Sequence, residues 1–133
     1  MSSSAEVTTV KEGYLLKRGE YIKNWRPRWF VLRSDGHLLG LKDKPNSEED
    51  YESPDMKLND FSIDRIQIAQ KTEVNGFFTF VIRCFQLTTL VERTLAADSL
   101  ADREDWIAQI EKVSKRFQEE HSAKSRDFKV PAT

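Results

Sequence analysis

The sequence predicts a mainly β protein with one α-helix, in which seven short antiparallel strands form a barrel or sandwich capped by a C-terminal amphipathic helix. Between residues 13 and 95, short apolar or alternating segments recur about every ten residues and are separated by turn sequences. Residues 100–118 lack glycine and proline and carry an apolar stripe with helical spacing. With 133 residues, 38% of them hydrophobic, the chain is long enough for one domain with its own core.

The first three strands are expected to form a meander. Residues 13–19 are bounded by glycines, and residues 28–33 follow Pro27 and are rich in aromatic and β-branched side chains. Ser34-Asp35-Gly36 then predicts a tight turn, because Asp bonds its own backbone and Gly accepts a positive φ. Residues 38–42 return as the third strand.

The remaining strands follow a break in the pattern. Pro45, Pro54 and a cluster of acids predict a long exposed loop at residues 43–57. Alternation at 61–64 and again at 66–69 predicts two short strands separated by a kink. Asn75-Gly76 indicates a hairpin before a strand at 78–83, and residues 90–95 supply the seventh strand.

The helix at 100–118 has its own start signal and polarity. Ser99 and Asp102 resemble a capping box, and the acids precede the bases along the helix, as its dipole favours. We expect its apolar stripe to pack on the chain's own barrel rather than in a partner's groove. The stripe consists of Trp106, Ile110, Val113 and Phe117. Residues 1–9 are then a flexible N-terminus, 10–118 the domain and 119–133 a polar tail or linker.

Several classes of protein are excluded by composition and motif. No apolar run could span a bilayer, and the first residues lack the features of a secretory signal. The single cysteine, Cys84, excludes an internal disulfide and is expected in the core. There is no glycine-rich phosphate loop, and His37 and His121 suggest no metal site or triad. We expect a cytoplasmic, monomeric, non-catalytic domain without cofactor or metal, and a pI near 6 argues against nucleic acid as a partner.

Charge is divided along the chain although the net charge is only −1. Residues 11–33 hold seven cationic and two acidic side chains, a local charge of +5. Residues 43–60 hold two cationic and seven acidic side chains, a local charge of −5. This division predicts a field that orients the chain toward an anionic partner, although two ordinary solvated faces would show the same segregation.

Specific motifs resemble those of the pleckstrin homology (PH) domain family. Gly13-Tyr14-Leu15 is similar to the family's opening motif, and Trp106 to the tryptophan of its last helix. Lys17 followed by Arg26-Pro27-Arg28-Trp29-Phe30 resembles the phosphoinositide-reading subset. Residues 11–13 and 17–28 closely resemble the PH domains of the protein kinase B (Akt) family. Residues 58–62, 82–84, 88–89 and 92–94 extend the similarity, which covers about residues 10–118. Leu87, where that subfamily usually has Trp, and the long acidic loop depart from the pattern.

The basic residues suit a phosphorylated inositol ring. Binding several phosphates requires multidentate donors, and guanidinium groups match phosphate oxygens two at a time. Arg26 and Arg28 share a face because they are two residues apart in a strand, and Lys17 is expected across the hairpin. Consecutive backbone N–H groups in the connection 19–25 could form an anion-binding concavity.

The resemblance also implies a role for each candidate residue. It assigns the 3-phosphate to Lys17, Arg26 and Arg28, and the 4-phosphate to Lys17, Asn59 and Arg93. It assigns the 1-phosphate side to Tyr21, Ile22 and Lys23, and leaves the 5-phosphate in solvent. We expect Glu20, an acid in this rim, to limit resting affinity by pairing with Lys17. Asn59 as a turn former and Arg93 as a partner of Glu92 or Asp98 are the alternatives.

The expected function is to bind phosphatidylinositol 3,4,5-trisphosphate and 3,4-bisphosphate, and so to recruit a parent protein reversibly from the cytoplasm to the inner leaflet of the plasma membrane. The parent would be a serine/threonine kinase, whose kinase domain could dock on this domain as an autoinhibitor. The alternative is a PH-like protein-interaction module with only weak, nonspecific adhesion to acidic lipids. In that case Arg26 and Arg28 would only be edge-strand charges.

Overall fold

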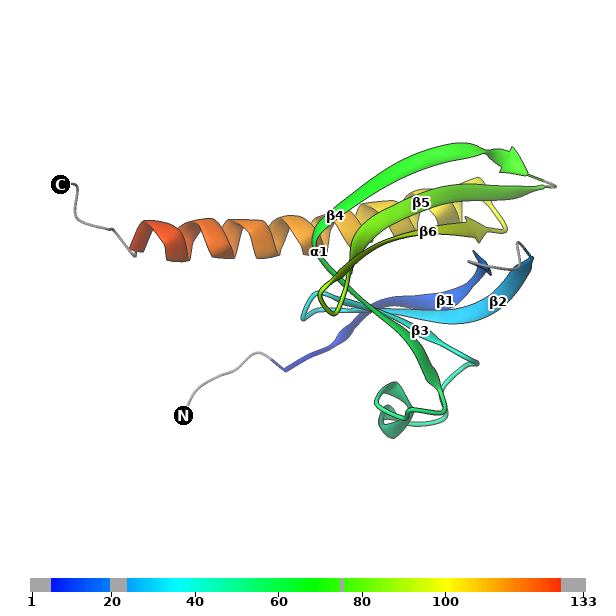
Figure 1. The fold of residues 1–133 in the computed structure, drawn as a ribbon, viewed down its shortest axis with the longest axis horizontal. Helices are drawn as coiled ribbons and strands as arrows, with labels where there is room; N and C mark the ends of the chain where they lie inside the picture. The colour runs from blue at the N-terminus through cyan, green and yellow to red at the C-terminus, as the bar shows by residue number, and fades with distance from the viewer. Residues whose placement is uncertain (1–5, 20–23, 75, 128–133) are drawn as a thin grey trace.

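The computed structural model describes residues 6–19, 24–74 and 76–127. Within them, six antiparallel strands close into a barrel in sequence order, and α1 follows the last strand (Figure 1). The strands are β1 (Thr9–Arg18), β2 (Trp25–Arg33), β3 (His37–Leu41), β4 (Lys57–Val74), β5 (Phe77–Gln86) and β6 (Thr89–Ala97). A short 3-10 helix, η1 (Glu48–Tyr51), lies between β3 and β4, and α1 spans Leu100–Asp127.

The predicted fold class is confirmed, but the described residues form six strands rather than seven. The segments expected as separate strands at 61–64 and 66–69 are parts of β4, a continuous strand of 18 residues. Its first half pairs with β3 and its second half with β5, with a register shift between Ser62 and Gln67. Such an irregularity bends a strand and breaks its alternation without ending it, which explains why the sequence indicated two.

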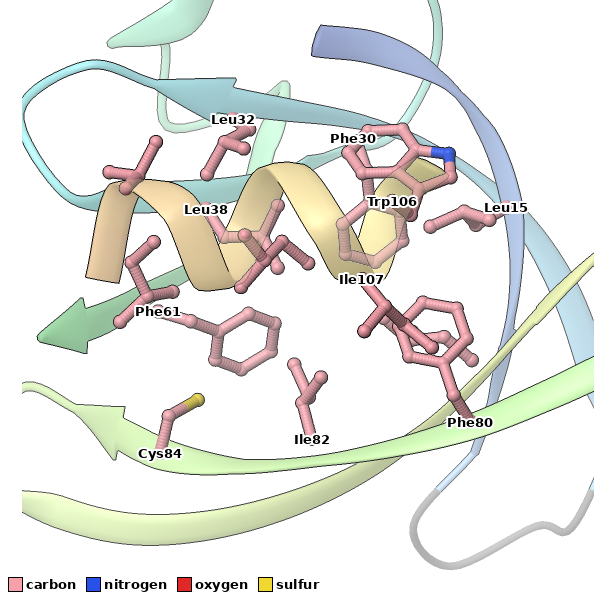
Figure 2. Close-up of a cluster of buried hydrophobic side chains, with 14 of the residues drawn as sticks. Leu15, Phe30, Leu32, Leu38, Phe61, Phe80, Ile82, Cys84, Trp106 and Ile107 are labelled. Carbon is pink, nitrogen blue, oxygen red and sulfur yellow. The ribbon is translucent and has the colours of Figure 1, made fainter. Parts of the chain in front are cut away.

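The core lies between the inner face of the barrel and α1 (Figure 2). Trp106, Ile110 and Val113 are buried, and Phe117 packs against the same cluster, so the helix stripe covers its own barrel as predicted. Each large apolar side chain buried in this way contributes about 1.5–3 kcal/mol. Among the described residues, no helix has both the length and the apolar character needed to cross a bilayer.

Local interactions fix the helix on the strands. The Ser99 hydroxyl accepts a hydrogen bond from the Asp102 backbone N–H at 3.0 Å, so the predicted cap is present. Lys11 of β1 joins the first turn, with its ammonium 3.1 Å from Asp102 and 2.8 Å from Asp105. The helix continues past the predicted residue 118 to Asp127, and its C-terminal part extends beyond the barrel (Figure 1).

The acidic loop between β3 and β4 is more structured than the sequence suggested. Tyr51 of η1 packs on a second apolar cluster, on the outer face of β2 and β3, formed by Val31, Leu39 and Leu41. The Arg33 guanidinium lies 4.7 Å from the centre of the Tyr51 ring. Prolines and acids predicted exposure, and the sequence offered no signal that Tyr51 would anchor the loop on the sheet.

Candidate functional site

The pairing of β1 with β2 gathers three predicted cations on one face. Lys17 lies directly opposite Arg26, and Leu15 directly opposite Arg28. Opposite residues in an antiparallel pair point to the same side of the sheet. Leu15 is a core residue, so Lys17, Arg26 and Arg28 belong to the inner face, at the end of the strands next to residues 19–25. We call this end of the inner face the mouth of the barrel.

Exposure increases from the core toward the mouth. Leu15 and Phe30 are buried, Lys17 and Arg28 are half-buried, and Arg26 is exposed. Arg28 donates from Nη1 to the Pro27 carbonyl at 2.9 Å, which uses one of the five N–H groups of a guanidinium. Arg28 also lines a surface pocket of about 680 Å³, which it shares with the outer-face pair Tyr14 and Asp43. The other residues lining it are Tyr14, Pro27, Lys42, Asp43 and Met56.

Asn59 reaches the same inner face through β3 and β4. Gly40 pairs with Phe30 on one side and with Asn59 on the other. A Cβ at Gly40 would lie only 3.2 Å from both Cβ and Oδ1 of Asn59, so glycine leaves room for this amide. The Asn59 Nδ2 donates to Oε1 of Gln86 at 3.3 Å. Within the described residues, its buried Oδ1 has no hydrogen-bond partner.

The unsatisfied Oδ1 of Asn59 makes its side-chain amide a candidate either for contact with a bound group or for a half-turn about its terminal bond. Leaving a buried polar atom unpaired is costly, so each such atom needs an explanation, and a functional position or a bound group is one. A half-turn of the Asn59 amide would put its N–H groups in the place of Oδ1, and a matching turn of Gln86 would keep their hydrogen bond. Gln86 was missed by sequence reasoning, because an uncharged residue before a turn carries no signal.

Arg93 lies on β6, the strand that closes the barrel onto β1. It pairs with buried Ile82, which places it on the inner face, and Leu95 two residues later pairs with Lys17. Arg93 donates from Nη1 to the Glu92 carbonyl at 2.9 Å. Five predicted residues, Lys17, Arg26, Arg28, Asn59 and Arg93, therefore lie on the inner face, contributed by β1, β2, β4 and β6.

Cys84 lies near this site but is not suited to chemistry. It is buried, and burial raises the pKa of its thiol to about 11, although the nearby Arg93 charge acts in the opposite direction. A thiol with so high a pKa is protonated at neutral pH and a poor nucleophile. The prediction that Cys84 serves as a small apolar core group is confirmed.

The other predicted contacts fall in the connection between β1 and β2. Glu20, Tyr21, Ile22 and Lys23 lie outside the described residues. The ends of this connection are held together by a hydrogen bond from the Gly19 N–H to the Asn24 carbonyl at 2.9 Å. The roles assigned to Glu20, Tyr21, Ile22 and Lys23 therefore stay predictions.

Two carboxylates near the candidate site, Asp60 and Asp43, form hydrogen bonds with side chains on the outer face. Asp60 lies 2.6 Å from Nδ1 of His37, and this hydrogen bond raises the pKa of His37 and lowers that of Asp60. Asp43 accepts a hydrogen bond from the Tyr14 hydroxyl at 2.6 Å, which raises the pKa of Tyr14 and lowers that of Asp43. Each acid has its own partner, and the inner-face cations are not needed to neutralise it.

A second pocket, of about 380 Å³, opens on the outer face. Its cations are already paired, with Arg33 at 3.6 Å from Glu48 and Lys57 at 3.3 Å from Glu52. Nowhere in the described ranges do three or more His, Cys, Asp or Glu residues come together as a metal site would need. The inner-face mouth is therefore the stronger candidate for binding an anion.

Comparison with known proteins agrees with the fold and with the sequence motifs. The PH domain family model matches residues 9–115. RAC-beta serine/threonine-protein kinase B of Xenopus laevis is 51% identical over 109 residues, which are 82% of this chain and 22% of that protein. The human RAC-beta serine/threonine-protein kinase is 49% identical over the same length, again 22% of its own. The chain thus spans only about a fifth of these relatives.

Solved structures show the same architecture. The C-terminal PH domain of pleckstrin superposes with a TM-score of 0.59 at 26% identity, over 80% of this chain and 98% of that one. The same pleckstrin domain in complex with D-myo-Ins(1,2,3,5,6)P5 gives a TM-score of 0.62 at 23% identity, over 80% of this chain and 96% of that one.

Proposed function

This chain belongs to the PH domain family, and we propose that its mouth binds the headgroup of 3-phosphorylated inositol lipids. The favoured ligands are phosphatidylinositol 3,4,5-trisphosphate and 3,4-bisphosphate. By this binding the chain recruits its parent protein reversibly from the cytoplasm to the inner leaflet of the plasma membrane. The likeness to RAC-beta (Akt) kinases supports a serine/threonine kinase as that parent, with this chain as a non-catalytic module on which the kinase domain docks.

The observation that carries the proposal is the cross-strand pairing of Lys17 with Arg26, with Arg28 next on the same face. Like charges directly opposite each other destabilise a sheet, so this arrangement favours an anionic ligand between them. A phosphate offers several acceptor oxygens, and guanidinium groups bind two of them in parallel. Lys17, Arg26 and Arg28 would take the 3-phosphate.

The 4-phosphate would lie on the far side of Lys17. Arg93 on β6 offers a second guanidinium there, and the Asn59 amide offers N–H donors once it has turned. The connection 19–25 would close over the 1-phosphate side through Tyr21, Ile22 and Lys23, with Glu20 lowering the resting affinity. A 5-phosphate would stay in solvent, so both lipids would be accepted.

Titration calorimetry with soluble inositol 1,3,4,5-tetrakisphosphate tests this function. We expect wild type to bind with micromolar or better affinity. Removing one charge-assisted phosphate contact costs about 1.5–3 kcal/mol, and Arg28→Ala, which breaks a two-pronged contact, is expected at the upper end or beyond detection. Arg83→Ala is the matched control, because it removes one cation from an exposed position on β5.

Equal losses in Arg28→Ala and Arg83→Ala would mean that only overall charge attracts the anion. The proposal would then fail in favour of a protein-interaction module with nonspecific adhesion to acidic lipids. Competition by inositol phosphates that lack the 3-phosphate tests the selectivity, and we expect them to bind more weakly than the 1,3,4,5-isomer.

A further inference from the structure

We propose that the tip of the β5–β6 hairpin, centred on Leu87, inserts into the membrane interface beside the bound lipid headgroup. This inference rests on the proposed function and adds an apolar contact to the ionic one. The partner is the bilayer itself, at the depth where headgroups meet acyl chains. Nothing in the ionic site requires this contact, so this inference can fail while the proposed function stands.

The backbone at Leu87 is held in a conformation that leucine disfavours. Gln86 pairs with Thr89, so Leu87 and Thr88 form a two-residue turn. Leu87 has a φ of 56°, and it is the only non-glycine residue with a positive φ among those described. Glycine is preferred at the first position of such a turn, because a Cβ clashes there. A leucine held in this conformation is a reason to ask what its side chain contacts.

That side chain does not stabilise the folded chain by packing. Leu87 is 88% exposed, the most exposed large hydrophobic residue in the described part of the chain. Leu90, on the same hairpin, is 48% exposed. Strain with almost no burial indicates that the leucine is presented to a partner, since neither feature favours folding.

The position of the tip favours a membrane over a protein as that partner. Gln86 is bonded to Asn59 of the mouth at 3.3 Å, so the next residue, Leu87, stands at the rim of the candidate headgroup site. The hairpin from Phe85 to Val91 carries no charged residue, whereas the mouth beside it is cationic. An apolar tip next to a cationic pocket matches the order of a bilayer, with anionic headgroups above an apolar layer.

Binding to vesicles of phosphatidylcholine with a few per cent phosphatidylinositol 3,4,5-trisphosphate tests the proposal. We expect Leu87→Ala and Leu87→Gly to weaken vesicle binding roughly tenfold, because a leucine side chain no longer leaves water. Affinity for soluble inositol 1,3,4,5-tetrakisphosphate should stay unchanged. Leu87→Gly should not lower the midpoint of thermal unfolding, which separates this role from a structural one.

The matched control is Leu100→Ala, since Leu100 is 49% exposed and follows the opposite end of β6. It should leave vesicle binding intact. Unchanged vesicle affinity in both Leu87 variants, with headgroup binding retained, would overturn the membrane contact alone. Absence of headgroup binding by wild type would overturn the proposed function and this inference with it.

A fluorescent label gives a second, direct measurement. Cys84 is buried, so a thiol reagent should label selectively the thiol introduced by Leu87→Cys. An environment-sensitive label there should shift to the blue when vesicles bind, and one placed by Leu100→Cys should not. A label that stays in water while the protein is fully vesicle-bound would assign the tip to a protein partner and overturn the proposal.

Discussion

Both faces of the sheet formed by β1 to β4 carry cationic side chains, but these side chains have different neighbours across the strands. On the outer face, three cationic side chains lie against carboxylates: Arg33 against Glu48, His37 against Asp60, and Lys57 against Glu52 and Asp60. At the mouth, Lys17 faces Arg26, and Arg28 donates to a backbone carbonyl. One face is an ion-pair network, and the other concentrates positive charge.

This difference separates cations that hold the acidic loop on the sheet from cations that we propose bind a ligand. The outer-face pairs fasten the acidic loop to the sheet, together with Tyr51. Exposed pairs of this kind contribute little each, about 0–1 kcal/mol. The mouth concentrates like charge at some cost to the fold, which is the pattern of a binding site whose requirements compete with stability. Replacing cations on the two faces should therefore have opposite effects.

Among the variants that compare the two faces, Arg26→Ala has the largest expected effect, and this effect is on binding. Affinity for inositol 1,3,4,5-tetrakisphosphate should fall by about 1.5–3 kcal/mol, because a charge-assisted phosphate contact is lost. The free energy of unfolding should stay level or rise by a few tenths of a kcal/mol, since Lys17 no longer faces a like charge. Calorimetric titration and denaturant unfolding measure the two quantities.

Lys57→Ala is the counterpart on the outer face. It should lower the free energy of unfolding by up to about 1 kcal/mol through loss of contacts with Glu52 and Asp60, and leave headgroup affinity unchanged. If Arg26→Ala instead destabilised the fold and Lys57→Ala weakened binding, the assignment of the two faces would be reversed.

A smaller effect is expected from Gln86→Leu, which sharpens the comparison within the mouth. Leucine fills similar space but cannot orient the Asn59 amide, so headgroup affinity should fall by about 1 kcal/mol. The salt dependence of binding should not change, because no charge is removed. In a double-mutant cycle, Gln86→Leu should cost little once Asn59 is already alanine. Additive losses would show that Gln86 does not act through Asn59.

Sequence reasoning predicted the fold well where a local pattern and a tertiary contact agree. The Asp35-Gly36 turn shows why: Gly36 has a φ of 89°, and a Cβ there would lie 2.8 Å from Phe117. Conformation and packing thus demand the same residue. β4 was divided wrongly in two, because a strand that changes partners at a bend loses its alternation locally without ending.

The charged residues of the candidate site were predictable from the sequence, and the uncharged ones mostly were not. Arg26 and Arg28 share a face by strand geometry alone, and their pairing with Lys17 follows from a hairpin. Gln86 and Gly40 were not predictable, since one is neutral and the other has no side chain, and their roles depend on β3, β4 and β5 meeting around Asn59.

The smallest expected effect is a pH dependence of stability on the outer face. The hydrogen bond to Asp60 raises the pKa of His37 above its ordinary 6.5, although partial burial opposes this. A pKa raised on folding gives stabilisation that is complete below the unfolded-state value and is lost as pH rises through the folded-state value. Asp60, its pKa lowered from 3.8 by the same bond, stabilises above that value and loses the effect as pH falls. The pair is therefore strongest between the two ordinary values, 3.8 and 6.5.

Thermal unfolding between about pH 6 and pH 8 measures this contribution, because histidine titrates in that range. The midpoint of wild type should fall slightly more than that of His37→Gln as the pH rises. The change is small because solvent screens the pair: the two side chains are 42% and 35% exposed. The chain has one other histidine, His121, which His37→Gln retains, so the difference between the two proteins isolates the outer-face pair. Equal slopes would mean that Asp60 is held by Lys57 rather than by His37, and headgroup affinity should be the same in both proteins at either pH.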